Sequence, residues 1–542
     1  MEIISGKLID IFNRNIFPAR IWIENGIILK VEETDSPQDQ YILPGFIDAH
    51  VHIESSLMSP SCFAECAVQQ GTVAVVADPH EIANVCGIQG MQFMIESAKS
   101  VPFQFYFGAP SCVPATSFET NGAEFHAETI EYLFKNFNLS FLSEMMNFPG
   151  VINGDKEVLQ KIEIAKLNNK PIDGHAPGLR GEKLNTYIHA GISTDHECTS
   201  LAEAEEKIEK GMKILIRQGS AAKNFEALYP LIAKYPDKVM ICTDDCHPEQ
   251  LLEGHINSII NRGLELGLSI FDLLQAACLN PVQHYNMHTG LLRKNDSADF
   301  IIASGISPIK IKQTWIAGKC IYSEGITYFK PKKLPPVNNF TAYPLLPEDL
   351  LVKVSALKMK VIHALDGELY TPYSIENVKS EYGFALSNPE ADILKIAVIN
   401  RYRKSSPALG FVKGFNLKIG ALATSVAHDS HNIIAVGTND KLMAKAINEI
   451  VKAKGGLAAC THEETLCLPL EVGGLMCQDS APAVANKLAQ LNALAKQMGC
   501  TLASPFMTLS FLSLLVIPSL KIGDRGLFDV DTFSFTNLFV ND

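Results

Sequence analysis

The sequence predicts an α/β protein: a closed (β/α)8 barrel, a small β-sandwich domain formed by the segments that flank it, and a C-terminal α/β domain. Three observations support this prediction. The chain has 542 residues, which suggests three or four folding units at roughly 150 residues each. Between residues 44 and 285, a short apolar stretch precedes an amphipathic stretch eight times. A proline-rich segment then separates this region from about 190 further residues.

The two ends of the barrel region resemble each other. Stretches rich in Ile and Val fill residues 3–33, with Gly6 and Asn25-Gly26 as turn signals. Similar short strands return within residues 298–325. We therefore expect residues 1–43 and 286–330 to combine into one β-sandwich domain.

The barrel is expected to span residues 44–285, with helices such as the amphipathic stretch 202–212 between its strands. A closed barrel places the C-terminal ends of all its strands on one face. The eight expected strands begin with the segment PGFIDAH and continue at 72–78, 103–108, 139–145, 171–175, 191–196, 213–218 and 239–245.

Residues 331–348 contain five of the 28 prolines of the chain and predict a linker. The remaining residues, 349–542, are expected to form a separate C-terminal domain. Strands are expected at 395–401 and 432–438, and a helix at 481–498.

Composition excludes several classes of partner. Lys and Arg total 46 against 59 Asp and Glu, so the formal charge is 46 − 59 = −13. This charge argues against nucleic acid and anionic membranes as partners. The longest apolar stretch, 509–517, is too short to span a bilayer.

The 13 cysteines include no C-x-x-C pair, and the N-terminal residues lack a signal-peptide pattern, so a reducing cytoplasm is expected.

His50 and His52 lie at the end of the first expected barrel strand, on either side of Val51. Because alternate residues of a strand point to the same face, the two imidazoles are expected to project together. That arrangement suits a divalent metal ion.

Four more candidate ligands end other barrel strands: Glu144, His175, His196 and Asp244. Each alone could be a core residue or a helix cap, but all are expected on the same face of the barrel. Four histidines and two carboxylates suit two divalent ions about 3.5–4 Å apart, and such ligands favour Zn, Fe(II) or Mn(II). The ions would activate a water, and an aspartate beside it could carry its proton to a leaving group.

Further polar residues lie near the expected barrel mouth and could read a substrate ring: His80, Glu81, Asn84, Asp245 and His247. A helix start explains the first three equally well, because Asp-Pro-His-Glu is typical of a capped first turn.

Three residues of the C-terminal domain, His428, Asp429 and His431, could contribute to the barrel mouth or bind another ion. A surface loop explains them equally well.

Cys242 and Cys246 flank Asp244, and we interpret them as packing residues. Zinc deaminases of the P-C-x-x-C type, zincins, serine hydrolases and P-loop proteins are not supported, since their motifs do not occur.

The segment PGFIDAHVHIE is similar to the opening motif of the amidohydrolase superfamily. Residues 77–85 (ADPHEIANV) and 426–432 (VAHDSHN) resemble the bacterial adenine deaminase family, and the resemblance extends over nearly the whole chain. It implies hydrolysis of adenine to hypoxanthine and ammonia in purine salvage. It also implies a homodimer or larger homo-oligomer.

The resemblance also implies roles for the candidate ligands. His50, His52 and Asp244 would hold one ion, and His175 and His196 the second. Glu144 would bridge the ions, where many relatives use a carbamylated lysine, and Asp244 would also shuttle the proton. The expected ions are Mn(II) or Fe(II), with Zn(II) as a further option.

Two alternatives remain open at this stage. The superfamily motif alone allows another reaction, on a cyclic amide or an N-acyl substrate, because one fold hosts many chemistries. A non-catalytic barrel that serves binding or assembly is the second alternative, although all six candidate ligands are present.

Overall fold

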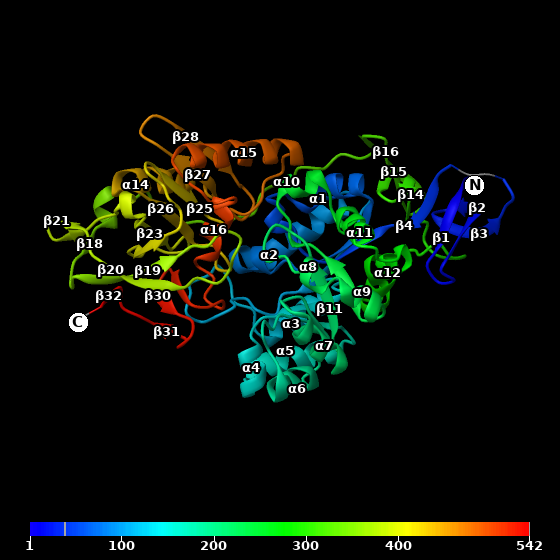
Figure 1. Cartoon of the computed structure of the whole chain (residues 1–542), viewed down its shortest axis with the longest axis horizontal. Helices are drawn as coiled ribbons and strands as arrows, with labels where there is room; N and C mark the ends of the chain where they lie inside the picture. Colours follow the sequence, from blue (N-terminus) through cyan, green and yellow to red (C-terminus); the bar gives the residue numbers. More distant parts are fainter. Residues whose placement is uncertain (37–38, 541–542) are drawn as a thin grey trace. The chain divides into compact units, whose positions relative to one another are not determined.

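The computed structural model describes residues 1–36 and 39–540, which divide into two compact units. The first unit contains residues 1–80, 94–112 and 125–334, and the second contains 81–93, 113–124 and 335–542. Each is a mixture of strands and helices (Figure 1). Among the residues described, none of the helices combines the length and apolarity that crossing a bilayer requires.

An eight-stranded sheet in the first unit joins strands from both ends of the barrel region. Its order is β17-β16-β15-β14-β4-β1-β2-β3, and β14 pairs antiparallel with β4 (Figure 1). The strands are β1 (Glu2–Asp10), β2 (Asn15–Glu24), β3 (Ile27–Glu33), β4 (Tyr41–Pro44), β14 (Phe300–Ile306), β15 (Ile309–Ile316), β16 (Lys319–Ser323) and β17 (Ile326–Thr327).

One of the two predicted turns in this sheet is confirmed and the other is wrong. Asn25 and Gly26 adopt φ values of 50° and 81° and link β2 to β3, as a tight hairpin requires. Gly6 instead continues β1 and pairs with Ala19. A Cβ at Gly6 would lie 2.7 Å from the Ile42 side chain, so the glycine permits close packing rather than a turn.

The barrel strands follow in sequence order, and all ladders between them are parallel. They are β5 (Phe46–His52), β6 (Thr72–Ala77), β7 (Gln104–Ala109), β8 (Phe141–Met145), β9 (Ile172–Gly174), β10 (Thr194–Asp195), β11 (Lys213–Arg217), β12 (Val239–Cys242) and β13 (Asp244–Asp245). Strand β13 continues β12 after one residue and pairs with β5, so the last strand position returns to the first. The predicted α/β class with a (β/α)8 barrel is confirmed.

Strands β9 and β10 are shorter than predicted, and side-chain hydrogen bonds add to the backbone bonds between the two segments. The amide of Gly174 donates to the Thr194 hydroxyl (3.2 Å), and the Ser193 hydroxyl donates to the carbonyl of Ile172 (2.9 Å).

Helices α1–α13 lie between or after the barrel strands. They are α1 (Pro60–Ala67), α2 (His80–Lys99), α3 (Ala127–Asn136), α4 (Phe148–Asn153), α5 (Lys156–Leu167), α6 (Gly181–His189), α7 (Leu201–Glu209), α8 (Phe225–Leu228), α9 (Pro230–Lys234), α10 (Pro248–Glu253), α11 (Ile256–Glu265), α12 (Ile270–Leu274) and α13 (Asn280–His284). Shorter turns are η1 (Ile53–Ser56), η2 (Val68–Gln70) and η3 (Gln275–Leu279).

A nine-stranded sheet dominates the second unit, in the order β20-β19-β24-β23-β26-β25-β27-β28, with β32 on β19. Helix α14 lies against β25–β27 (Figure 1). A core that is mainly Ile, Leu and Ala side chains fills the space between them. The strands of this sheet are β19 (Lys358–His363), β20 (Tyr373–Asn377), β23 (Leu394–Ile399), β24 (Ala408–Lys413), β25 (Ala421–Thr424), β26 (Ile433–Gly437), β27 (Gly456–Cys460), β28 (Thr465–Pro469) and β32 (Phe539–Val540).

The other elements of the second unit are two small sheets, three helices and two short turns. They are β18 (Val352–Lys353), β21 (Ser380–Glu381), β22 (Phe384–Ala385), β29 (Leu520–Gly523), β30 (Gly526–Asp529), β31 (Ser534–Phe535), α14 (Asp440–Ala453), α15 (Ala481–Gln497), α16 (Pro505–Phe511), η4 (Pro347–Leu350) and η5 (Pro389–Ala391).

Lys521, on β29, is fully buried in the second unit. Its Nζ donates to the carbonyls of Leu369 (2.7 Å) and Phe511 (3.0 Å). Burial lowers the pKa of the amine from its ordinary value of 10.5 to about 7. Between these two values the unfolded chain binds more protons than the folded protein, so this lysine makes stability rise with pH.

Lys521→Met is therefore expected to remove this pH dependence. Relative to the variant, the parent should gain up to about 1.4 kcal/mol in free energy of unfolding per pH unit between pH 7 and 10. Urea denaturation of both proteins at pH 7, 8.5 and 10 measures this difference. The exposed Lys441 on α14 offers a control, since Lys441→Met should shift stability equally at each pH. Parallel pH curves for the parent and Lys521→Met would contradict the prediction.

Candidate active site

All six predicted metal ligands lie in the first unit, at or next to the C-terminal ends of barrel strands. His52 is the last residue of β5 and His50 lies two residues before it. Glu144 is in β8, and Asp244 is the first residue of β13. His175 and His196 directly follow β9 and β10. Five of the six are buried, and His175 is partly buried.

Glu144 lies at the centre of this group. Its Oε2 is 2.9 Å from His175 Nδ1 and 3.2 Å from His196 Nε2. Its Oε1 is 3.4 Å from His52 Nε2 and 3.6 Å from His80 Nδ1. Each carboxylate oxygen therefore faces a different pair of imidazoles. Burial alone would raise the pKa of Glu144, but His175 and His196 outweigh it and hold the pKa well below its usual value.

Asp244 presents its two oxygens to different partners. Oδ1 lies 3.1 Å from His52 Nε2 and 3.6 Å from His50 Nε2, whereas Oδ2 accepts a hydrogen bond from Arg217 Nη1. Burial works to raise the pKa of Asp244, but Arg217 and His52 hold it well below its usual value. The backbone of Asp244 adopts a φ of 61°, a conformation uncommon outside glycine that recurs at functional sites.

Arg217 and Glu197 are site residues that the sequence reasoning missed. The guanidinium of buried Arg217 donates to both oxygens of Glu197, through Nη2 at 2.9 Å and through Nη1. Glu197 Oε1 also lies 3.5 Å from His196 Nε2 and 3.6 Å from His175 Nδ1. The same strand-end rule could have found Arg217, because it ends β11 on the face that carries the predicted ligands.

The state of the imidazoles fits a metal centre. Within the described part of the chain, neither ring nitrogen of buried His50 has a hydrogen-bond partner. Burial, together with His196 and His52, lowers the pKa of His50 well below its ordinary value, so the ring is neutral and one of its nitrogens keeps a lone pair for a metal ion. His52 directs Nδ1 to the carbonyl of Asp78 (3.1 Å), which leaves Nε2 facing the carboxylates. Metal-binding histidines use their second nitrogen in this way.

Three of the imidazoles carry raised pKa values. For His52, burial opposes the shift, but the neighbouring carboxylates raise the pKa well above its ordinary value. Burial opposes the shift, but the hydrogen bond and charge of Glu144 raise the pKa of His196 to about 9. For His175, Glu197 and Glu144 outweigh burial and raise the pKa. A divalent ion would supply the positive charge that these protons provide.

Among the predicted ligands and their neighbours in the described part of the chain, three sets of donor atoms are close enough to share an ion, each with all atoms within 4.8 Å of one another. They are His52 with Asp78, His80 and Glu144; His50 with His196 and Asp244; and Glu144 with His175 and His196. The third set matches the grouping that the resemblance implied. The first two differ from it, since His52 groups with His80 and His50 with His196.

The residues proposed to contact substrate separate into the two units. His80 belongs to the first unit, where its ring lies 4.7 Å from that of His52 in an edge-on arrangement. Asp245 accepts a hydrogen bond from the Ser55 hydroxyl, and the amide of His247 donates to the Ser220 hydroxyl (2.8 Å).

Glu81 and Asn84 belong to the second unit, as do His428, Asp429 and His431. Glu81 Oε1 lies 3.2 Å from His428 Nδ1, and Glu81 Oε2 lies 3.9 Å from His431 Nε2. The amide of Ala427 donates to His431 Nδ1 (3.2 Å), so Nε2 carries the proton of the neutral ring and points to the carboxylate. Among the described residues His431 Nε2 makes no hydrogen bond, and Glu81, His428 and His431 place three donor atoms within 4.8 Å of one another.

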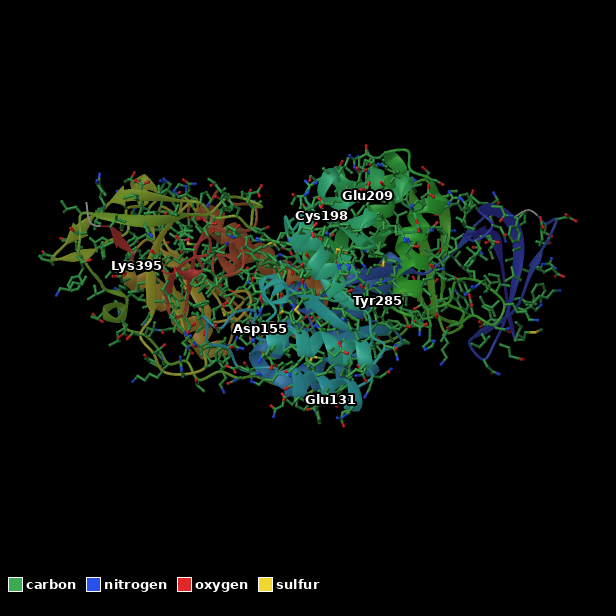
Figure 2. All side chains as sticks on the ribbon, turned by 90° about the horizontal axis from the view of Figure 1, so that it is seen from below. Glu131, Asp155, Cys198, Glu209, Tyr285 and Lys395 are labelled. Atoms are coloured by element: carbon green, nitrogen blue, oxygen red, sulfur yellow. The ribbon has the colours of Figure 1, made fainter. Side chains whose placement is uncertain are left out.

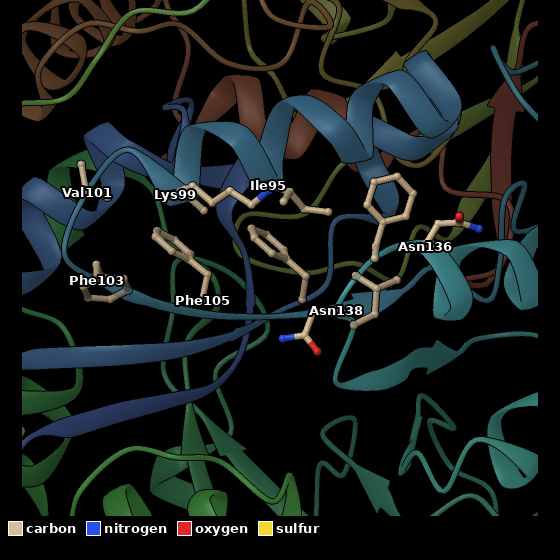
Figure 3. Close-up of a pocket in the computed structure, with 11 residues that line it drawn as sticks. Ile95, Lys99, Val101, Phe103, Phe105, Asn136 and Asn138 are labelled. Atoms are coloured by element: carbon tan, nitrogen blue, oxygen red, sulfur yellow. The ribbon is translucent and has the colours of Figure 1, made fainter. Parts of the chain in front are cut away.

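An apolar cavity of about 340 Å³ lies elsewhere in the first unit (Figure 3). Phe103, Phe105 and Phe107 line it together with the ends of α2 and α3. None of the predicted site residues borders it.

Comparison with known proteins identifies the family. Residues 41–321 match the amidohydrolase family, and residues 368–534 match the adenine deaminase C-terminal domain. An adenine deaminase from Methanosarcina mazei is 50% identical, with 100% of each chain covered. One from Salinibacter ruber is 48% identical, with 99% of each chain covered. The chain belongs to the adenine deaminase family.

Membership in the adenine deaminase family accounts for both matched regions of the chain. The first region contains the barrel strands with the six candidate ligands, and the second lies in the second unit. Among solved structures, a β-aspartyl dipeptidase from Fervidobacterium islandicum AW-1 aligns with 61% of this chain and 99% of its own, at 17% identity and a TM-score of 0.47.

Proposed function

We propose that this adenine deaminase family member hydrolyses adenine to hypoxanthine and ammonia. The observation that carries the proposal is the arrangement around Glu144, in which each carboxylate oxygen faces a separate pair of imidazoles. Relatives named adenine deaminase, about half identical over the full length, support the choice of substrate. The proposal includes a role in purine salvage in the cytoplasm.

The same arrangement supports two divalent ions as cofactors, and we propose Mn(II) or Fe(II), with Zn(II) as a further option. His50, His52 and Asp244 would hold one ion, and His175 and His196 the other. Glu144 would bridge them. When bound, the ions would lower the pKa of a water so that hydroxide is available near neutral pH.

The proton transfer is proposed for Asp244. Asp244 is held ionised by Arg217, so it can accept a proton. Because Arg217 occupies Oδ2, the transfer uses Oδ1, which faces His52 and His50. As the oxygen of the nucleophile bonds to C6 of adenine, Asp244 would take its proton at Oδ1 and deliver it to the C6 amine, so that the C6–N bond breaks and ammonia leaves.

For substrate contact we propose the polar residues near the strand ends, because their donors and acceptors complement purine nitrogens. These residues are His80, Glu81, Asn84, Asp245 and His247, with His428, Asp429 and His431 as a contribution of the C-terminal domain. The proposed partners are adenine and further copies of the chain, in a homodimer or larger homo-oligomer.

An assay of ammonia release with adenine and added Mn(II), followed by elemental analysis, tests the proposed function. We expect turnover of adenine and about two transition-metal ions per chain. A panel with a cyclic amide and an N-acyl substrate tests the other amidohydrolase reactions. Turnover of one of these without adenine turnover would overturn the substrate assignment, and protein without metal or activity in all assays would favour the non-catalytic barrel.

A further inference from the structure

A buried ion-pair network lies behind the two histidines proposed for the second ion. Lys207, on α7, is completely buried, and its Nζ donates three hydrogen bonds. The acceptors are Glu203 Oε1 (2.7 Å), the carbonyl of Ala176 (2.8 Å) and Asp195 Oδ2 (3.0 Å). An ammonium group has three donors, so all of them are used.

Two of the three acceptors of Lys207 are direct neighbours of the histidines in the chain, whereas Glu203 lies on α7 itself. Ala176 follows His175 directly, and Asp195 precedes His196 directly. The two loops are also bonded to each other, because the amide of Ala176 donates to Asp195 Oδ1 (2.8 Å). Ala176 is therefore held at both its amide and its carbonyl.

The two carboxylates extend this network further along the same loops. Asp195 Oδ2 accepts from the amide of Glu197 (3.2 Å), on the far side of His196. Glu203 accepts from the amide of Gly178 (2.9 Å), in the loop after His175, and from that of Thr199 (3.4 Å). Each histidine thus sits in a short segment whose backbone is bonded to the Lys207 network.

The ammonium group of Lys207 is the cation between the carboxylates of Asp195 and Glu203. Asp195, Glu203 and Cys198, which is labelled in Figure 2, place three donor atoms within 4.8 Å of one another. Lys207 bonds both carboxylates directly. Burial alone would lower the pKa of Lys207, but Asp195, Cys198 and Glu203 raise it above its usual value, so the ammonium stays charged. The group is therefore an internal ion pair.

We propose that Lys207 is a positioning residue that fixes the spacing of His175 and His196 by tying their two loops together. The two rings lie 5.3 Å apart at 73°, and a nitrogen of each faces the same oxygen of Glu144. The inference rests on the proposed two-ion site, since it concerns the half that these histidines would form. Partners behind metal ligands commonly contribute about 10- to 100-fold to metal affinity.

Titration of the full-length apoprotein with Mn(II) tests the proposal. We expect the parent to bind two ions per chain. Lys207→Met should bind one ion as the parent does and the second about 10- to 100-fold more weakly. Lys395, labelled in Figure 2, offers a matched control: it is a buried lysine of the second unit that bonds Asp440 and the carbonyl of Leu350. Lys395→Met loses a similar ion pair and should bind both ions as the parent does.

Glu203→Gln provides a milder variant, because glutamine keeps an acceptor for Gly178 but loses the charge that pairs with Lys207. It should weaken the second ion by less than Lys207→Met does. Binding of both ions with parental affinity by every folded variant of this network overturns the role of Lys207, even where thermal stability falls. A parent protein that binds no Mn(II) would instead overturn the proposed two-ion site.

Discussion

Replacement of Asp244 by alanine is expected to reduce ammonia release from adenine to background, a loss of at least about 10³-fold in kcat. General acid–base groups contribute about 10²- to 10⁴-fold, and Asp244 is also a proposed ligand. Its Oδ1 faces the imidazoles of His50 and His52. Ammonia assays at saturating adenine, with metal content measured on the same sample, check this prediction.

Asp244→Asn separates the two roles of this side chain. The amide keeps an oxygen that can face the imidazoles but cannot carry a proton, so activity should fall while more metal is retained than in Asp244→Ala. Asp237→Ala is a suitable control, because Asp237 is exposed and pairs only at 3.4 Å with Lys238. Substantial adenine turnover by Asp244→Ala would disprove the mechanism.

Glu144→Ala is expected to lose both ions and to lower activity by at least about 10³-fold. The reason is that both oxygens of Glu144 face donor nitrogens, those of His175 and His196 on one side and that of His52 on the other. Removal of one ligand of a single ion would leave the other ion in place. Removal of a shared ligand weakens both.

Elemental analysis of purified Glu144→Ala protein should therefore find fewer than one ion per chain. Glu131→Ala serves as the control, since Glu131 is exposed on α3 and pairs with Lys135 one turn away (Figure 2). Retention of two ions by Glu144→Ala would show that Glu144 does not bridge them.

The predicted ligands could be found in the sequence because a simple rule locates them. The barrel pattern sets where each strand ends, and a barrel brings those ends to one face. Glu144 and Asp244 were found by this rule although they are about 100 residues apart. His175 and His196 were found in the same way, next to strands that are shorter than expected.

The residues that hold the site together were harder to predict. Arg217, Glu197 and Lys207 were not among the predicted site residues, and the segment 202–212 was predicted only as an amphipathic helix. In the structure Lys207 is completely buried, because α7 directs it towards Asp195 and the backbone beside His175. Helical periodicity shows which residues share a face, but it does not show what that face meets.

The sequence by itself determined the α/β class, the order of the barrel strands and the six candidate ligands, because periodicity and strand ends are properties of local stretches of chain. The tertiary structure alone decided which atoms meet. It directed the two oxygens of Glu144 to different histidines, placed Arg217 on Asp244, and brought His80 beside His52. Such distances depend on how neighbouring strands and loops pack, and that packing is set by contacts between residues far apart in the sequence.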